Sequence, residues 1–346
     1  MASFEGKTDA YQLLRQKADG FSNVIPDREF IFPNDHYPHE SFKIEWWYFT
    51  ANLADEAGNE YGVHWTLFRQ AMDPLPNQGG WQSNQTWMAH TAISTPDSFT
   101  FAERFARGGV GQAGVQYAGN QSRFEAWIDD WTWIGQTHSP FPGTLSASAE
   151  DKHFVLDLSA SERWILQGES GFSQKSQFGQ ASYYYSQPFV NVTGRLWKGG
   201  KSVSISGKGW LDREWSSQPL ADDQPGWDWI SLHLHDGSAL MVYRLRHRDT
   251  APFLSGTWVD STGFKVSLKP EDITLVPLRF DTIAAGSEEK ALPLAWSLVI
   301  PGLAIDLIVS AVRQDSWLDT AFPYWEGPVA VTGSQTGLGY LELTGY

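Results

Sequence analysis

The stretch Glu45–Arg69, EWWYFTANLADEAGNEYGVHWTLFR, holds two runs of aromatic and aliphatic residues on either side of a polar segment. The first run is WWYFTANL from Trp46, the second is YGVHWTLFR, and DEAGNE lies between them. Aromatic and β-branched residues favour strands, whereas short segments rich in Gly, Asn and Asp favour chain reversals. The stretch therefore predicts an antiparallel hairpin.

A similar pattern begins at Trp227, where WDWISLHL is followed by HDGS and then by ALMVYRLR, ending at Arg246. Each first run has aromatic residues at its first and third places and a leucine at its last, and each second run ends in an arginine. We expect an internal duplication in which each hairpin opens one β-domain. Chance similarity between two aromatic hairpins is the alternative.

The rest of the 346-residue chain also favours strands. Runs of strand-forming residues are separated by turn segments such as KGG, DSTG and GSQTG, and helical periodicity is confined to a short segment near Asp9–Ala18. The sequence thus predicts an all-β fold made of barrels or sandwiches. The chain length favours two domains. The linker-like segment QPLADDQPG, Gln218–Gly226, places them at residues 1–220 and 221–346.

Composition restricts the possible partners. The chain has 18 Trp, 20 Phe and 12 Tyr, which suits a cavity for a small hydrophobic molecule. A net charge of −15 argues against binding to nucleic acid or to anionic membrane surfaces. The absence of cysteine excludes disulfides and thiolate chemistry, and no metal or organic cofactor is predicted. The oligomeric state stays open.

Two segments bear on the cellular location. The longest apolar stretch, residues 292–312, is interrupted by Pro301-Gly302 and contains Asp306, so it predicts two strands rather than a membrane span. The first twenty residues lack the apolar segment of a secretory signal. The sequence is compatible with the cytoplasm, or with the periplasm or secretion if a signal peptide has been removed.

The segment GKGWLDREWSSQ, Gly207–Gln218, places three ionisable groups between two tryptophans. Side chains alternate between the two faces of a strand. One face of this segment would therefore carry Trp210, Asp212 and Glu214. The other face would carry Leu211, Arg213 and Trp215. Asp212 and Glu214 would lie about 7 Å apart beside an indole, where repulsion and desolvation favour keeping one proton near neutrality, as a general acid requires. The alternative is a structural role, with Arg213 and backbone groups satisfying both carboxylates at a barrel rim.

Further polar residues lie within aromatic strands. Glu45 either pairs with an arginine such as Arg69 or faces a cavity. His64 and His90 are each either a hydrogen-bonded core residue or a residue lining a cavity. The chain contains no G-x-S-x-G, H-E-x-x-H or Walker pattern, so nothing supports a nucleophilic serine, a zinc protease or a phosphate loop.

Several ordered motifs resemble the AttH/CrtC family. They are EWWYFTANL…YGVHWTLFR, MAHTAIS, YYYSQP, GWLDREWSSQ, the hairpin from Trp227 and the tail YWEGPVAVTGSQTGLGYLELTGY, and together they extend from about Phe32 to Tyr346. The resemblance implies two lipocalin-like (calycin-type) β-domains packed together, with a hydrophobic ligand pocket in or between them. The family is described as carotenoid 1,2-hydratase-like, and its members are also called secreted hydrolases.

For the hydratase branch, the resemblance implies that an Asp protonates an isoprenoid double bond before water adds. Asp212 matches that acid, and Trp210 is the aromatic residue two places before it. Tyr183 and Tyr185 match pocket positions, and we expect at least three of Tyr183, Tyr185, Trp210 and Trp229 to line one cavity. The leading interpretation is acid–base chemistry on a terpenoid-like or other apolar molecule. The alternatives are a non-catalytic carrier of hydrophobic ligands and a hydrolase that uses Asp212 and Glu214.

Overall fold

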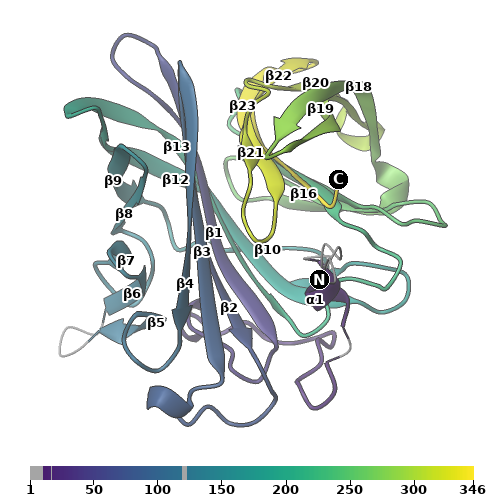
Figure 1. Cartoon of the computed structure of the whole chain (residues 1–346). Coiled ribbons are helices and arrows are strands. Elements are labelled where there is room, and N and C mark those ends of the chain that lie inside the picture. Colours follow the sequence, from purple (N-terminus) through teal and green to yellow (C-terminus); the bar gives the residue numbers. More distant parts are fainter. Residues whose placement is uncertain (1–10, 17, 119–122) are drawn as a thin grey trace, which may run out of the picture.

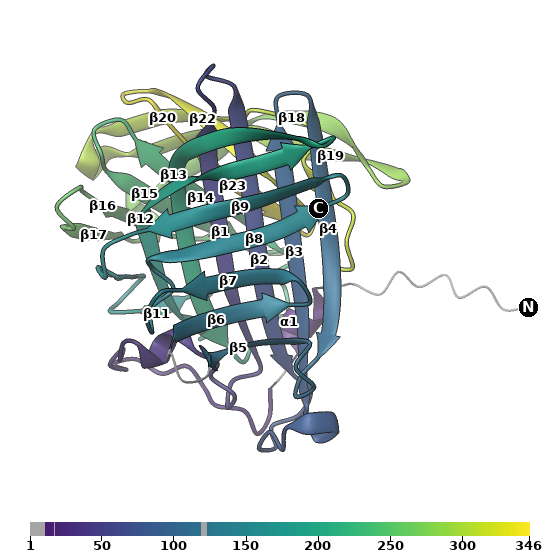
Figure 2. The ribbon, with the colours of Figure 1, turned by 90° about the vertical axis from the view of Figure 1, so that its left-hand side faces the viewer.

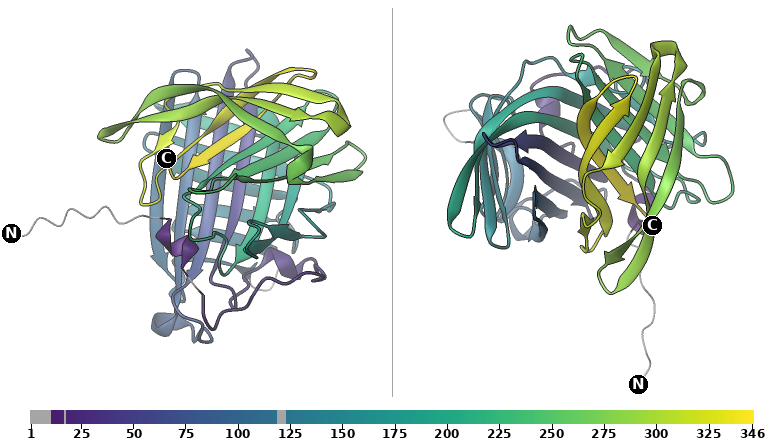
Figure 3. Two further views of the ribbon diagram at one scale, coloured as in Figure 1. Left: turned by 90° about the vertical axis from the view of Figure 1, so that its right-hand side faces the viewer. Right: turned by 90° about the horizontal axis from the view of Figure 1, so that it is seen from above.

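The computed structural model describes residues 11–16, 18–118 and 123–346. Within these residues the chain forms a sheet of 13 strands followed by a sheet of 10 strands. Each sheet is strongly curled, and the two lie side by side (Figures 1 and 3). The protein is therefore an all-β protein with two lipocalin-like sheets, as the sequence predicts.

The first sheet is a meander whose last strand returns to its first. Its strands are β1 (Ile44–Ala54), β2 (Glu60–Ala71), β3 (Gln85–Thr95), β4 (Ser98–Arg107), β5 (Ala113–Ala118), β6 (Arg123–Ile128), β7 (Trp131–Gly135), β8 (Gly143–Ala149), β9 (Lys152–Ser159), β10 (Ile165–Leu166), β11 (Phe172–Gln174), β12 (Ala181–Lys198) and β13 (Lys201–Ser216). The order is β4-β3-β2-β1-β13-β12-β9-β8-β7-β6-β5, with β10 and β11 beside β12. The sheet curls until β5–β9 cross over β1–β4, as Figure 2 shows, so it nearly closes on itself.

The second sheet repeats this plan. Its strands are β14 (Trp227–Leu234), β15 (Ala239–Leu245), β16 (Phe253–Val259), β17 (Lys265–Leu268), β18 (Thr274–Ala285), β19 (Glu288–Ile300), β20 (Ile305–Ala311), β21 (Trp317–Leu318), β22 (Tyr324–Gly333) and β23 (Gly337–Thr344). The order is β17-β16-β15-β14-β23-β22-β20-β19-β18, with β21 beside β22. In both sheets the opening hairpin pairs with the last strand, and the predicted hairpins are β1–β2 and β14–β15. The expected linker falls between β13 and β14.

Helical structure in the described residues is limited to single turns. These are the α-helix α1 (Gln12–Arg15) and the 3-10 turns η1 (Asn34–His36), η2 (Gly80–Gln82), η4 (Pro270–Asp272) and η5 (Pro301–Leu303). Of the predicted helical segment near Asp9–Ala18, residues 9, 10 and 17 lie outside the described part of the chain. The turn η5 separates β19 from β20, which agrees with the predicted break at Pro301-Gly302.

Side chains fill the interior of each curled sheet. Trp47, Phe49 and Trp65 belong to the core of the first sheet, whereas Trp296 and Trp325 belong to that of the second. A third apolar cluster joins the outer faces of the two sheets and includes Tyr48, Tyr184, Trp210, Trp229 and Tyr243. Because both interiors are packed, the space between the sheets is where a ligand cavity can form.

Candidate active site

Strand register aligns polar side chains in a row across the outer face of the first sheet. The row crosses β12, β13, β1, β2 and β3 through the paired positions Ser186, Asp212, Tyr48, Thr66 and His90. Directly paired residues point to the same face of a sheet. The row therefore faces the second sheet as one surface.

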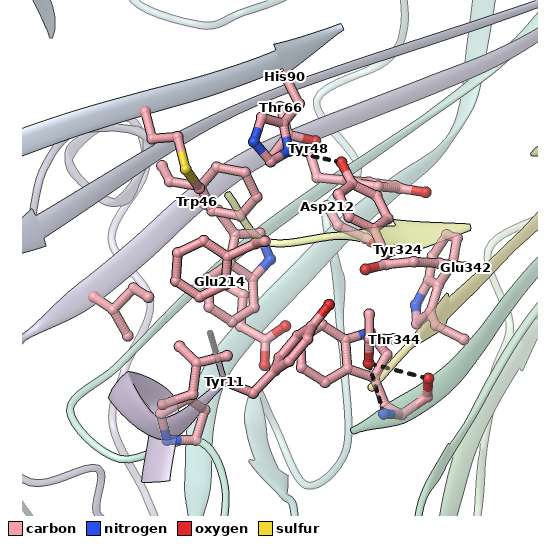
Figure 4. Close-up of a pocket in the computed structure, with 18 of the residues that line it drawn as sticks. Tyr11, Trp46, Tyr48, Thr66, His90, Asp212, Glu214, Tyr324, Glu342 and Thr344 are labelled. Atoms are coloured by element: carbon pink, nitrogen blue, oxygen red, sulfur yellow. Dashed lines mark hydrogen bonds between the residues drawn. The ribbon is translucent and has the colours of Figure 1, made fainter. Parts of the chain in front are cut away.

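The second sheet presents a matching row. Tyr243, Trp229, Glu342 and Glu326 occupy paired positions on β15, β14, β23 and β22. Between the two sheets lies a cavity of about 230 Å³, lined by Asp212 and Glu214 from β13, by Glu342 from β23, and by many aromatic side chains. Figure 4 shows these groups around the cavity together with Trp46, Tyr48 and Tyr324.

Asp212 is 3% exposed and is held by three neutral donors. The Trp210 indole N–H donates to Oδ1 at 2.8 Å, Ser186 Oγ donates to the same oxygen, and Tyr184 Oη donates to Oδ2 at 2.8 Å. None of the described Lys, Arg or His residues forms an ion pair with it. Burial raises its pKa to about 7 against these hydrogen bonds, and the nearby Glu214 adds to the rise.

Glu214 is neutralised on the same wall of the cavity. Lys175 Nζ lies 2.6 Å from its Oε1, and Ser182 Oγ donates to that oxygen as well. Burial opposes the charge of Lys175, but Glu214 raises the pKa of the ammonium on balance. The two neighbouring carboxyls on β13 thus differ: Glu214 has a cation, and Asp212 has only neutral donors.

Arg213 points the opposite way, into the end of the first curled sheet. There it forms an ion pair with Glu45, which also pairs with Arg69. Burial would raise the pKa of Glu45, but the two guanidiniums hold it well below its usual range. Of the two alternatives predicted for Glu45, the structure shows the ion pair with arginine. This ion pair also keeps the charge of Arg213 away from Asp212.

The family assignment follows from sequence comparison. The AttH-like family profile matches residues 23–346. The chain belongs to the AttH-like family. A Nitrosomonas europaea structure assigned to AttH has 33% sequence identity and a TM-score of 0.81, with 94% of this chain and 99% of that chain covered.

Two more distant structures share the fold of this AttH-like protein. Kievitone hydratase from Nectria haematococca has a TM-score of 0.68 at 14% identity, covering 95% of this chain and 97% of its own. CghA, solved with Sch210972, has a TM-score of 0.58 at 11% identity and the same coverage. No curated protein matches the chain.

The structure corrects the expected cavity positions of two tyrosines in this AttH-like protein. Tyr183 and Tyr185 pair with Trp215 and Arg213, so they lie on the face opposite Asp212. There they pack in a separate aromatic cluster with Trp215. Tyr184, between them, is the tyrosine that faces the cavity.

The two tryptophans expected at the cavity have different places. Trp229 lines it and donates its indole N–H to Tyr184 Oη at 3.2 Å. Trp210 belongs to the apolar cluster between the sheets but not to the cavity lining. It contacts the site through its hydrogen bond to Asp212 and through an edge-to-face contact with Trp229. The expectation that at least three of the four aromatic residues line one cavity is therefore wrong.

Both predicted histidines line the cavity, and both are also hydrogen-bonded. His64 Nε2 lies 2.6 Å from Thr66 Oγ1, while its Nδ1 has no hydrogen-bond partner in the structure. His90 contacts Tyr324 Oη at 2.9 Å and Glu103 at 3.0 Å. Burial lowers the pKa of both imidazoles, so they are uncharged at neutral pH.

Residues that the sequence analysis did not single out complete the site. They are Tyr184, Lys175, Glu326 and Glu342. A signal for Glu342 exists in the tail LELTGY, because alternation places it on the face opposite the core residues Leu341 and Leu343. Lys175 follows the short strand β11 and carries no such pattern.

The described residues show neither a metal-binding cluster nor a membrane-spanning helix. They contain no group of three or more His, Cys, Asp or Glu side chains arranged to hold a metal ion. None of their helices has the length and apolar character needed to cross a membrane.

Proposed function

We propose that this AttH-like protein adds water to a carbon–carbon double bond of an apolar, terpenoid-like molecule, with Asp212 as the general acid. One observation carries the proposal. Asp212 is a buried carboxyl with a pKa near neutrality that faces an aromatic cavity without a cationic partner. A group of this kind exchanges a proton readily at physiological pH.

The hydrogen bonds of Asp212 indicate which oxygen carries the proton. Oδ1 accepts two hydrogen bonds, from Trp210 and Ser186, whereas Oδ2 accepts one, from Tyr184. The proton therefore belongs on Oδ2. Transfer to an alkene carbon forms a C–H bond and leaves a cation on the neighbouring carbon, with the negative charge on Asp212 stabilised by its three donors.

The reaction is completed by water. A water oxygen bonds to the cationic carbon, and the proton that it loses returns to the Asp212 carboxylate. Alkene and water thus give an alcohol, with no net change in the protein. Trp46, Tyr48 and Trp229 line the cavity, and aromatic rings of this kind stabilise a nearby positive charge.

The geometry is less favourable for the two alternative functions. A carrier needs only apolar walls and gains nothing from a buried carboxyl that lacks a counter-ion. A hydrolase that uses Asp212 and Glu214 needs both groups at the reacting bond. Glu214, however, lies on the same strand as Asp212 and is engaged by Lys175 and Ser182.

The test is hydration of isoprenoid alkenes in ¹⁸O-labelled water, with mass spectrometry to detect labelled alcohols. Asp212→Asn keeps the shape of the side chain but removes the transferable proton. We expect turnover to fall by about 10²–10⁴-fold while substrate affinity changes little. Asp306→Asn, at an exposed position, is the control. Equal turnover in Asp212→Asn would refute the acid role.

A further inference from the structure

Glu326 and Glu342 lie directly opposite each other on the neighbouring strands β22 and β23. Glu326 is 1% exposed, and Glu342 is partly accessible from the cavity that it lines. None of the described basic residues forms an ion pair with either carboxyl. Two enclosed carboxyls at facing positions without a cation cannot both ionise at moderate pH.

Their contacts show how this pair is connected to the site. Tyr48 Oη, from the first sheet, donates to Glu326 Oε1 at 2.8 Å, and Glu326 Oε2 has no hydrogen-bond partner in the structure. Glu342 is paired in register with Trp229, which also lines the cavity. Glu342 therefore presents its carboxyl to the cavity from the second sheet, whereas Glu326 lies behind Glu342 and does not line the cavity.

Burial favours the neutral form of both groups. It raises the pKa of Glu342 to about 8, against hydrogen bonding from Trp227, and Asp212 and Glu214 add to the rise. The pKa of Glu326 is raised well above its usual range, by burial first and then by Glu342. At neutral pH Glu342 is a carboxylic acid with an O–H to donate.

The other charged and titratable groups around the cavity leave this state intact. The cavity lining includes two cations, Lys175 and Arg69, and ion pairs with Glu214 and Glu45 already balance them. The phenols of Tyr48, Tyr184 and Tyr324 have raised pKa values and stay neutral, mainly because they are buried. The imidazoles of His64 and His90 are uncharged, as described above.

We propose that Glu342, backed by Glu326 and Tyr48, is a neutral hydrogen-bond donor that binds an uncharged oxygen of the ligand, a hydroxyl or a carbonyl. The proposal rests on the proposed function in taking this cavity as the substrate site, and it adds the substrate class. An apolar molecule would place its oxygen at Glu342 on the second sheet, with its double bond at Asp212 on the first. Glu342 is thus a positioning and specificity residue.

This arrangement disfavours an anionic ligand. A carboxylate in the cavity would be desolvated beside Asp212, Glu342 and Glu326. Among the described lining residues, the cations Lys175 and Arg69 are already engaged, by Glu214 and Glu45 respectively. A neutral hydroxyl or carbonyl meets an available donor without that cost. Charge on the head group should therefore decide which ligands bind.

Three probes with one carbon skeleton test this specificity. At pH 7 geraniol is neutral, geranic acid is an anion and geranylamine is a cation. Binding is followed through quenching of the cavity tryptophans. We expect geraniol to bind at least about tenfold more tightly than either charged probe. Equal or tighter binding of geranic acid would overturn the proposal, tighter binding of geranylamine would identify a cation site instead, and no detectable binding of geraniol would also count against it.

Two variants isolate the donor. Above pH 8 the wild type loses the donated proton, so we expect its affinity for geraniol to decline. Glu342→Gln keeps an N–H donor but does not titrate, so its affinity should stay within about threefold of the wild type at pH 7 and should not decline above pH 8. Glu342→Leu removes the donor and should weaken geraniol about fivefold, but not myrcene, the hydrocarbon analogue without oxygen. The exposed Glu289→Gln serves as the control. The same alkaline decline in Glu342→Gln as in the wild type would contradict the role of Glu342.

A measurement without ligand checks the protonation directly. In infrared titration, the wild type should show a carbonyl stretch of a protonated carboxyl that disappears near pH 8 and is missing from Glu342→Gln. It is separate from the stretches of Asp212 and Glu326, which both proteins retain. Its absence from the wild type would overturn the proposal. Asp212→Asn separates the two proposals, because it should reduce hydration by about 10²–10⁴-fold while geraniol still binds more tightly than the charged probes.

Discussion

Replacing Asp212 by Asn should make the protein more stable at alkaline pH. Burial raises the pKa of Asp212 from 3.8 to about 7, so the native state holds a proton that the unfolded chain releases. The stability of the wild type therefore falls as pH rises from about 4 to about 7, and the loss is complete above that range. A shift of roughly 3 pH units corresponds to about 4 kcal/mol.

Asparagine retains most contacts of this position. Its Oδ1 can accept from Trp210 and Ser186, and its Nδ2 can donate to Tyr184 Oη, whose own hydroxyl proton then loses an acceptor at a cost of about 1 kcal/mol. We thus expect the mutant to be less stable than the wild type by about 1 kcal/mol at pH 4. At pH 8 it should be more stable by about 3 kcal/mol.

Urea unfolding between pH 4 and pH 8.5, followed by circular dichroism and tryptophan fluorescence, measures this difference. Asp306→Asn, at an exposed position outside the cavity lining, is the control. A mutant-minus-wild-type difference that stays constant over the whole range would refute the reasoning. So would a mutant that loses stability relative to the wild type as pH rises.

Two other substitutions test the framework around the site. Glu45→Gln leaves the guanidiniums of Arg69 and Arg213 buried without their shared carboxylate. Urea unfolding should therefore show that the free energy of unfolding falls by about 3–5 kcal/mol. A fall of less than about 1 kcal/mol would mean that this ion-pair network is not needed for stability. Gly339→Ala would place a Cβ 1.9 Å from the Ser231 carbonyl oxygen, across the β14–β23 pair. We expect it to reduce both stability and ligand binding, and an unchanged melting temperature would contradict the tight approach of these strands.

Much of the fold could be predicted because its signals are local. Aromatic runs and polar turns identify the hairpins at Trp46 and Trp227, and the Pro301-Gly302 break separates β19 from β20. The face of β13 could also be predicted, since alternation alone puts Asp212 and Arg213 on opposite sides. These inferences need only the neighbouring residues.

The faces of β12 could not be predicted in the same way. Residues Ala181–Pro188 are buried on both faces, so no alternation of polar and apolar side chains shows which tyrosine faces which side. The pairing of Ser186 with Asp212 decides the matter, and it is a contact between distant segments. The pairing register of β12 shifts between Gln187 and Val190. The alternation seen after Val190 therefore does not show which way the tyrosines before Gln187 point.

The position of the cavity explains why charges lie between tryptophans in this chain. Each sheet curls around its own packed core, so the outer faces of the two sheets are left to meet each other. Alternation sends Arg213 inward, where Glu45 neutralises it, and turns Asp212 outward to a surface that only the second sheet buries. That sheet supplies Glu342 and Trp229 rather than a cation for Asp212. The low dielectric that keeps Asp212 protonated is therefore created by the packing of the two sheets, and neither sheet alone would contain the site.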